Sequence, residues 1–180
     1  MANPLKIVRL DGTHSPGPTF SPAFQHTYIS YTNTDFNTDL ISSRIGDADV
    51  VISTRIPVSA ATIAACPNLK LVAVCAIGSD HVDLAACKER GITVSNVPAA
   101  SVEAVAEHAI ALFFALRRNV VGMHQLTVKG DEWGKTGSLA GQFGGMPGTC
   151  RDDVMGIFGA GELGPPLSLL LFSLQCVEVM

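Results

Sequence analysis

Clustered positive charge, long apolar runs and paired cysteine motifs are all missing from this sequence of 180 residues. The formal net charge is −4, and the longest basic run is the pair Arg117-Arg118. Because affinity for nucleic acid comes mainly from clustered cations, the sequence argues against DNA or RNA as a partner. No stretch approaches the ~20 apolar residues of a membrane span, and residues 1–11 contain no signal-peptide core. We therefore expect a cytoplasmic protein with no membrane partner.

Cysteine is scarce and unpatterned, with five residues and no CxxC spacing. An odd number without metal-ligand spacing fits reduced thiols rather than disulfides or a zinc site, so we expect no metal centre. The sequence is instead rich in hydrophobic residues, at 47% against 16% charged. Since a chain of this length can bury roughly 70% of its unfolded surface, a globular protein is expected and a disordered one is excluded.

Five short runs rich in β-branched residues alternate with helix-like stretches over residues 1–100. They are 6–10, 27–31, 49–53, 71–75 and 93–96. The third and fourth are apolar at consecutive positions, as expected for strands that are covered on both faces. This alternation predicts an α/β fold with a doubly wound parallel sheet. Between the last two strands, Asp80 is expected to cap a helix that Gly91 ends.

The composition and periodicity of the sequence change after residue 100. Residues 101–129 contain no proline, and their apolar positions recur at helical spacing, which predicts one long connecting helix over 101–130. From 131 to 150 glycine recurs every few residues and predicts a flexible hinge. We expect a first domain at 1–100 and the start of a second domain at 151–180.

A glycine motif follows directly on an apolar stretch, 153–158, which is expected to be a strand. The motif consists of Gly159, Ala160, Gly161, Glu162, Leu163 and Gly164, a G-x-G-x-x-G pattern. In such a turn, dinucleotide phosphates bind free N–H groups at the start of a helix. A glycine-rich turn without a ligand is the alternative. Because Pro165 and Pro166 stand where the first helical turns should run, the helix is expected to start late or to be distorted.

Residues 76–83 follow the fourth predicted strand, at the sheet edge where ligands of open α/β sheets usually bind. The backbone amides of Ile77 and Gly78 are candidates for holding a small carboxylate. The alternative is that Asp80 only caps a helix and that His81 lies at the surface in its first turn. Farther along, His108 follows Glu107, but adjacent positions face different sides of a helix, which favours a structural histidine over a general base.

Taken in order, several segments resemble the D-isomer-specific 2-hydroxyacid dehydrogenase family, and within it the glycerate or hydroxypyruvate dehydrogenases. The similarity extends over about residues 45–164. The segments are PNLKL (67–71), IGSDHVD (77–83), RGI (90–92), NVP (96–98), VAEHA (105–109), EW (132–133) and the glycine motif. The resemblance implies a flavodoxin-like first domain on the substrate side and a truncated Rossmann-type second domain.

The resemblance also implies chemistry: oxidation or reduction between a D-2-hydroxy acid and its 2-oxo counterpart, with NAD or NADP. It implies that Ile77 and Gly78 bind the substrate carboxylate, that Arg55 lies at the substrate cleft, and that Val105 lies near the nicotinamide. The six residues of the glycine motif, 159–164, would bind the pyrophosphate. The family's catalytic Arg, Glu and His lie later in its chains, so no catalytic residue is expected among these 180.

The tail, 165–180, has no charged residue before Cys176 and is rich in leucine. A helix there would be apolar nearly all round and would need a further layer to cover it. We expect this tail to be the truncated or misread end of a longer product, with no partner layer within these residues. The alternative to an enzyme is a non-enzymatic truncated form that associates with full-length subunits, and a homodimer through the 101–129 helix is also expected.

Overall fold

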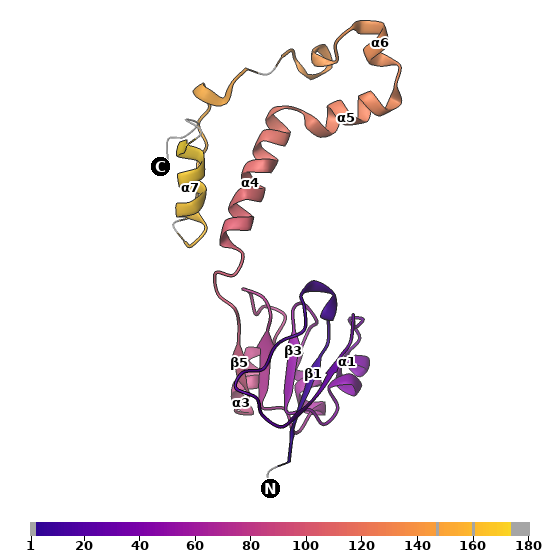
Figure 1. Ribbon diagram of the computed structural model, residues 1–180, viewed down its shortest axis with the longest axis vertical. Helices are drawn as coiled ribbons and strands as arrows, with labels where there is room; N and C mark the ends of the chain where they lie inside the picture. The colour runs from indigo at the N-terminus through magenta and orange to yellow at the C-terminus, as the bar shows by residue number, and fades with distance from the viewer. Residues whose placement is uncertain (1–2, 147, 160, 174–180) are drawn as a thin grey trace. The chain divides into compact units, whose positions relative to one another are not determined.

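The computed structural model describes residues 3–146, 148–159 and 161–173. Two compact units make up the chain, unit 1 at Met1–Ala100 and unit 2 at Ser101–Met180. Unit 1 contains a five-stranded sheet with the order β2-β1-β3-β4-β5 (Figure 1). The strands are β1 (Leu5–Arg9), β2 (His26–Ser30), β3 (Val50–Ser53), β4 (Leu71–Val74) and β5 (Thr93–Ser95). All five predicted strands are confirmed, with bounds that differ by at most one residue.

Every neighbouring pair of strands is parallel. Ile7 of β1, for example, lies opposite Tyr28 of β2 on one side and Val50 of β3 on the other. This strand order is the flavodoxin-like, doubly wound order, in which the chain leaves β1 in one direction and β3 in the other. The predicted α/β fold is confirmed.

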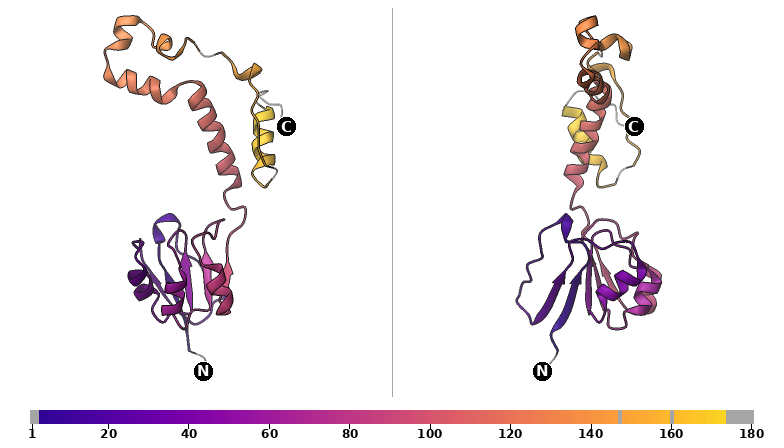
Figure 2. Two further views of the ribbon diagram at one scale, coloured as in Figure 1. Left: turned by 180° about the vertical axis from the view of Figure 1, so that it is seen from behind. Right: turned by 90° about the vertical axis from the view of Figure 1, so that its right-hand side faces the viewer.

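Three helices cover one face of this sheet: α1 (Thr38–Ile45), α2 (Ala60–Ala65) and α3 (Leu84–Glu89) (Figure 2). Their inner faces and the central strands form the core of unit 1. The core includes Val8, Leu10, Val51, Val72 and Val74 from the strands and their ends, Ile41 and Ile45 from α1, Ile63 from α2, and Cys87 from α3. Burial of these aliphatic side chains is the main stabilising contribution to unit 1.

On the opposite face of the sheet, the connection from β1 to β2 packs over β1. Arg9 is only 2% exposed there, and its guanidinium donates to the carbonyls of Ser15 at 2.8 Å and Pro16 at 3.0 Å. Because parallel crossovers are right-handed, the connections on the two sides of β1 must lie on opposite faces. The sheet is therefore wound in both directions although the first crossover contains only a 3-10 turn, Gly12–His14.

The residue that caps α3 differs from the sequence prediction. Asp83, not Asp80, accepts the N–H of Ala86 at 2.9 Å and caps the helix. The segment before Asp83 is a turn, in which the Val82 N–H donates to Ser79 at 2.9 Å, followed by an isolated parallel bridge between Val82 and Val58. The helix consequently begins only at Leu84, while Gly91 follows its end with a φ of +65° as expected.

Unit 2 begins with two helices where one was predicted: α4 (Val102–Arg117) and α5 (Val120–Lys129). The prediction of a continuous helix is wrong because Asn119 adopts a φ of +51°, in the left-handed region that no α-helix can continue through. Asparagine is one of the few residues that tolerate this conformation. Within the described residues, no helix is both long and apolar enough to cross a membrane.

The glycine-rich stretch after α5 contains ordered structure. It holds α6 (Glu132–Thr136) and a 3-10 turn at Ala140–Phe143. Leu139 is 1% exposed, and the Phe143 ring lies so close to Gly122 that a Cβ there would stand 2.7 Å from it. This part of the expected hinge is thus packed against α5.

The last described helix is α7 (Gly164–Ser173), which lies alongside α4 (Figures 1 and 2). The expectation that the tail has no partner layer is therefore wrong for its first turns. The strand predicted at 153–158 is also absent, and Phe158 is fully exposed. A strand needs a neighbour to pair with, and the described part of unit 2 contains none.

The cysteines differ in part from expectation. Cys66, Cys75 and Cys87 are free thiols, whereas Cys150 is disulfide-bonded, so the prediction of reduced cysteines throughout is wrong. Burial raises the pKa of the Cys66 and Cys87 thiols, which keeps both protonated and unreactive at neutral pH.

Candidate functional site

The carboxyl ends of β3 and β4 bring two of the predicted substrate-binding segments to one edge of the sheet. Arg55 follows β3, and the loop 76–78 follows β4. Because β3 and β4 are parallel neighbours in register, their following loops leave the sheet side by side. This is the edge where open α/β sheets bind ligands.

Three hydrogen bonds with neighbouring segments hold the loop 76–78 and the residue before it. The Cys75 N–H donates to Ser53 at 2.9 Å, the Val97 N–H to Ala76 at 3.0 Å, and the Asn96 side-chain amide to the Ile77 carbonyl at 2.7 Å. The N–H groups of Ile77 and Gly78 have no acceptor among the described residues. A fixed loop with two unsatisfied amides can bind a small anion.

Asp80 modifies the charge of this loop. A Cβ at Gly78 would stand 2.8 Å from the Asp80 carboxylate, so glycine at this position lets the carboxylate approach the main chain. That exposed negative charge opposes anion binding at the adjacent amides, although water and salt weaken the repulsion.

Arg55 lies at the same edge, but its guanidinium is directed toward the loops that follow β1 and β2. Its Nε donates to His14 at 2.8 Å, its Nη2 donates to Asn33, and the group lies 5.4 Å from the centre of the Phe36 ring. Within the described part of the chain, none of its hydrogen bonds reaches the 76–78 loop. The structure therefore brings Arg55 to the edge without joining it to Ile77 and Gly78.

His81 is half-buried, which corrects the expectation of a surface histidine in the first turn of a helix. It precedes α3 and lies in the turn before Val82, where its carbonyl accepts the Val58 N–H at 2.8 Å. Its Nε2 is buried without a partner among the described residues. Burial lowers the pKa of His81, while the carboxylates of Asp11 and Asp80 partly oppose that shift. The imidazole is accordingly neutral at pH 7.

Asp11 is the residue that sequence reasoning missed. It follows β1, is fully buried, and accepts the N–H groups of Thr54 and Arg55, each at 2.9 Å. The available signal was an aspartate directly after a buried strand, at the edge where ligands bind. Buried carboxylates are rare unless they are paired, so this position was a candidate for a structural or functional role.

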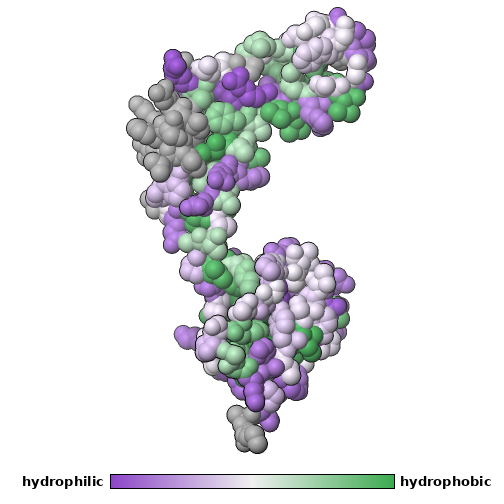
Figure 3. Space-filling model, viewed as in Figure 1, coloured by the Kyte–Doolittle hydropathy of each residue, from purple (hydrophilic) through white to green (hydrophobic). Residues whose placement is uncertain are grey.

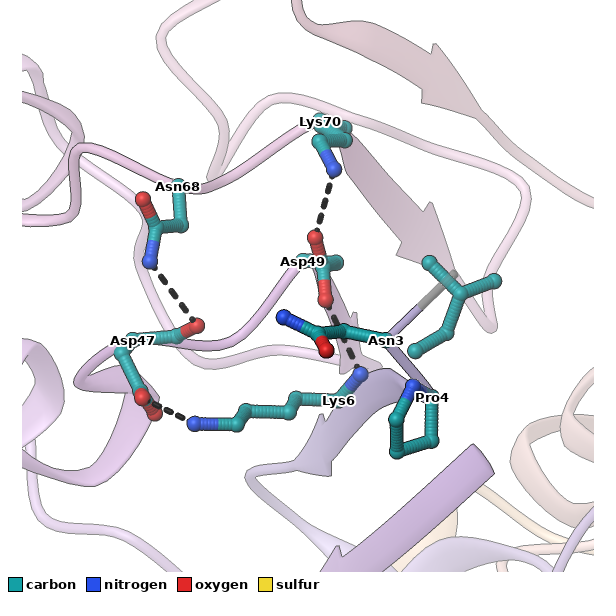
Figure 4. Close-up of a pocket in the computed structure, with 8 residues that line it drawn as sticks. Asn3, Pro4, Lys6, Asp47, Asp49, Asn68 and Lys70 are labelled. Atoms are coloured by element: carbon teal, nitrogen blue, oxygen red, sulfur yellow. Dashed lines mark hydrogen bonds and ion pairs between the residues drawn. The ribbon is translucent and has the colours of Figure 1, made fainter. Parts of the chain in front are cut away.

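At the opposite edge of the sheet, where the strands begin, charged residues line a hollow (Figure 4). These charged side chains form ion pairs with one another. Lys6 forms an ion pair with Asp47, and the Lys70 amine donates to Asp49 at 2.7 Å. The Lys6 N–H, at 3.0 Å, and Lys70 together lower the pKa of Asp49. Because its charged groups satisfy one another, this hollow is a weaker candidate than the carboxyl edge.

The glycine motif lies in unit 2 and forms a tight turn. Gly159 has a φ of +115°, the Gly164 N–H donates to Gly161 at 3.0 Å, and a Cβ at Gly164 would stand 2.9 Å from the Gly159 carbonyl oxygen. Glu162 and Leu163 are exposed, and Ala160 lies outside the described residues. The strand that was predicted to precede this turn is missing from the described residues.

The prolines after this motif are accommodated. α7 begins at Gly164, so Pro165 and Pro166 fall in its first turn, where a missing N–H removes no helical hydrogen bond. On α4, Val105 is 44% exposed, and Glu107 and His108 are exposed as well. No group of three or more potential metal ligands occurs among the described residues.

The match to a family model decides what kind of protein this is. The model of the D-isomer specific 2-hydroxyacid dehydrogenase catalytic domain matches residues 13–172. The chain belongs to this family. A glycerate dehydrogenase of Methylorubrum extorquens is 34% identical over 163 residues, which cover 91% of this chain and 51% of that protein. Formate dehydrogenase 1 of Saccharomyces cerevisiae is 38% identical over 130 residues, 71% of this chain and 33% of that one.

A solved structure extends the similarity to the whole chain. The NAD-dependent formate dehydrogenase of Staphylococcus aureus, in complex with NAD, superposes with a TM-score of 0.76 at 28% identity, and covers 98% of this chain and 55% of that one. This chain spans about half the length of the first curated relatives that it matches.

Proposed function

We propose that these residues supply the substrate-side part of an NAD(P)-dependent oxidoreductase that acts on the CH–OH group of D-2-hydroxy acids of the glycerate and hydroxypyruvate type. The main support is the pair of unsatisfied amides at Ile77 and Gly78, in a loop fixed at the ligand-binding edge. Membership of the family and the glycerate dehydrogenase relative agree with it. Unit 1 is then the outer, substrate-side domain.

In this proposal the two amides bind and orient the carboxylate of the acid. The guanidinium of Arg55 adds a positive charge at the same edge. Orientation of C2 is what the 76–78 loop contributes to the reaction. We assign no general acid or base to this chain, so a polypeptide of residues 1–180 alone does not turn over these acids.

The cofactor in this proposal is NAD or NADP, which accepts or supplies the hydride when it is bound. Val105 would lie near the nicotinamide. The pyrophosphate would contact the turn made by Gly159, Ala160, Gly161, Glu162, Leu163 and Gly164. Since this turn lacks a supporting strand in the described residues, binding of the cofactor by residues 1–180 alone is weak.

A second function is a non-enzymatic form that associates with full-length subunits of a related enzyme. The observation in its favour is the exposed apolar surface of α4, where Leu112 is 51% and Leu116 78% exposed. Pairing of two copies through residues 101–129 would use the same surface. In either case we place the protein in the cytoplasm, without a nucleic-acid or membrane partner.

The test uses oxalate, a small dicarboxylate that cannot be reduced, and NMR of the labelled 180-residue chain. We expect saturable shifts of the Ile77 and Gly78 amides, and no turnover of hydroxypyruvate or glyoxylate with NADH or NADPH. Shifts that instead gather at Lys6 and Lys70 would place anion binding at the wrong edge of the sheet. A rate comparable with that of an intact dehydrogenase would show that residues 1–180 contain the catalytic groups.

A further inference from the structure

The strand order of unit 1 puts its switch point between the carboxyl ends of β1 and β3. The chain winds away from β1 toward β2 on one side and from β3 toward β4 on the other. In doubly wound sheets this switch point opens a crevice in which ligands usually bind. Here the residues that face each other across it are Asp11, after β1, and Thr54 and Arg55, after β3.

At this switch point the chain itself supplies a carboxylate, that of Asp11. It is 0% exposed. Its Oδ1 accepts the Thr54 N–H at 2.9 Å, and its Oδ2 accepts the Arg55 N–H at 2.9 Å and the Thr54 N–H at 3.1 Å. Consecutive main-chain N–H groups that converge on one point form an anion-binding nest. Burial of an unpaired carboxylate would be very costly, so these bonds are required for Asp11 to lie where it does.

The same bonds fix the turn that carries Arg55. Inside the turn, the Ser53 hydroxyl donates to the Ile56 carbonyl at 2.9 Å and accepts the Ile56 N–H at 3.0 Å. Asp11 holds the outside of the turn to the end of β1, where the Leu10 N–H also donates to Ile52 at 3.0 Å. With its main chain held from both sides, Arg55 keeps its position at the sheet edge.

We propose that Asp11 is a positioning residue, an internal anion at the switch point that holds the Thr54–Arg55 turn so that Arg55 stands at the substrate edge. This inference rests on the proposed function, since it assumes that Arg55 contributes to carboxylate binding. Asp11 does not touch the substrate, and it acts only through the turn. Its carboxylate occupies the nest that an external anion would otherwise take.

The experiment compares Asp11→Ala with Thr34→Val in the 180-residue chain. Thr34 is a matched control because it is also buried and donates to the carbonyl of Leu10, at 2.6 Å, but has no hydrogen bond with Thr54 or Arg55 among the described residues. Two readouts are amide hydrogen exchange at Thr54 and Arg55, and the affinity for oxalate. Both are measured under conditions in which slow exchange of the Val51 and Val72 amides shows that the core remains folded.

In Asp11→Ala we expect both amides to exchange about tenfold faster or more, and oxalate to bind about tenfold more weakly, because both N–H groups lose their hydrogen bonds to a charged group. Formate should fill the vacated nest and slow the exchange again, whereas Thr34→Val should change neither readout. If Asp11→Ala does not fold, Asp11→Asn keeps the volume and one acceptor oxygen but loses the charge. Both amides should then exchange faster than in the unmodified chain, because a neutral oxygen accepts N–H groups more weakly than a carboxylate.

Three results would overturn the proposal. In the first, the Thr54 and Arg55 amides of Asp11→Ala exchange no faster than those of Thr34→Val. In the second, these amides of Asp11→Ala exchange faster but the affinity for oxalate is unchanged. The third is an Asp11→Asn variant in which both amides stay protected. If the unmodified chain binds no oxalate, the proposed function fails, and exchange together with rescue by formate still decides whether Asp11 holds the turn.

Discussion

The two units of this chain differ in where they keep their apolar side chains. In unit 1 the aliphatic residues of the sheet and of α1–α3 form one continuous core. In unit 2 only Ala106 and Leu139 are buried among the residues whose burial is described. Exposed instead are Leu112, Leu116, Val120, Val121 and Val128, on α4 and α5 (Figure 3).

The two units are therefore stabilised in different ways. Unit 1 buries enough apolar surface to fold as a cooperative body. Unit 2 consists of helices that pack pairwise, such as α4 with α7, without enclosing a core in its described part. Long-lived structure in unit 2 therefore requires a further apolar surface to cover it.

Replacement of one leucine in each unit should give the largest difference between the two units. Leu10→Ala, at a fully buried position in unit 1, should lower the free energy of unfolding by about 2–5 kcal/mol. Leu116→Ala, at a position 78% exposed in unit 2, should change it by less than about 0.5 kcal/mol. Urea unfolding followed by circular dichroism measures both. Equal losses would show that Leu116 is covered as well as Leu10 is, and that unit 2 also buries an apolar core.

Removal of residues 165–180 tests how unit 2 is covered. Because α7 lies along α4, its removal should expose more of the apolar surface of α4 and increase self-association. The melting transition of unit 1 should stay where it is. Light scattering of the truncated and the 180-residue chain measures self-association, and differential scanning fluorimetry measures the melting transition. A truncated chain that is monomeric and more soluble would contradict the prediction.

The pH dependence of stability should belong in part to His81 of unit 1. Its pKa is lowered in the folded protein, chiefly by burial, so protonation favours the unfolded state. The contribution is complete above the unfolded pKa of about 6.5 and is lost as the pH falls through the folded pKa. His81→Gln should therefore flatten the fall in melting temperature between neutral and mildly acidic pH. His108→Gln, at an exposed position in unit 2, serves as the control.

The smallest effect concerns charge beside the 76–78 loop. Asp80→Asn removes the carboxylate next to Gly78 and should strengthen oxalate binding a few-fold, by roughly 2- to 5-fold at low salt. Glu89→Gln makes the same change of charge at the end of α3, near the opposite edge, and should leave the affinity unchanged. Titration calorimetry at two salt concentrations would show a difference that fades as salt is added. Equal effects of the two variants would mean that only net charge matters.

The sequence predicts unit 1 well because its signals are local. Runs such as Val50-Val51-Ile52 report burial on both faces of a parallel strand, and each strand was found within one residue. The capping residue of α3 was missed because the bridge between Val58 and Val82 is a tertiary contact that no local pattern reports. Asp11 was missed for the same reason, since its partners are 43 and 44 residues away.

The prediction for unit 2 is less accurate, because local sequence patterns there do not report which segments pack against each other. The apolar run 153–158 has the composition of a strand, but a strand forms only beside a partner. The break at Asn119 depends on a single residue in a rare conformation, within a stretch whose periodicity continues on both sides. For the candidate site, the loop 76–78 was found from its place after a strand, whereas the direction of the Arg55 side chain depends on His14 and Asn33.

The two prolines of α7 change what the start of that helix offers to an anion. A helix ordinarily begins with unpaired N–H groups, but Pro165 and Pro166 carry none. The Gly164 N–H donates to Gly161 at 3.0 Å, and the Leu167 N–H donates to Leu163 at 3.3 Å. The first four positions of α7 thus leave no main-chain donor free. A phosphate there would feel the positive end of the helix dipole without hydrogen bonds from α7, so its attraction would be mainly long-range and sensitive to salt.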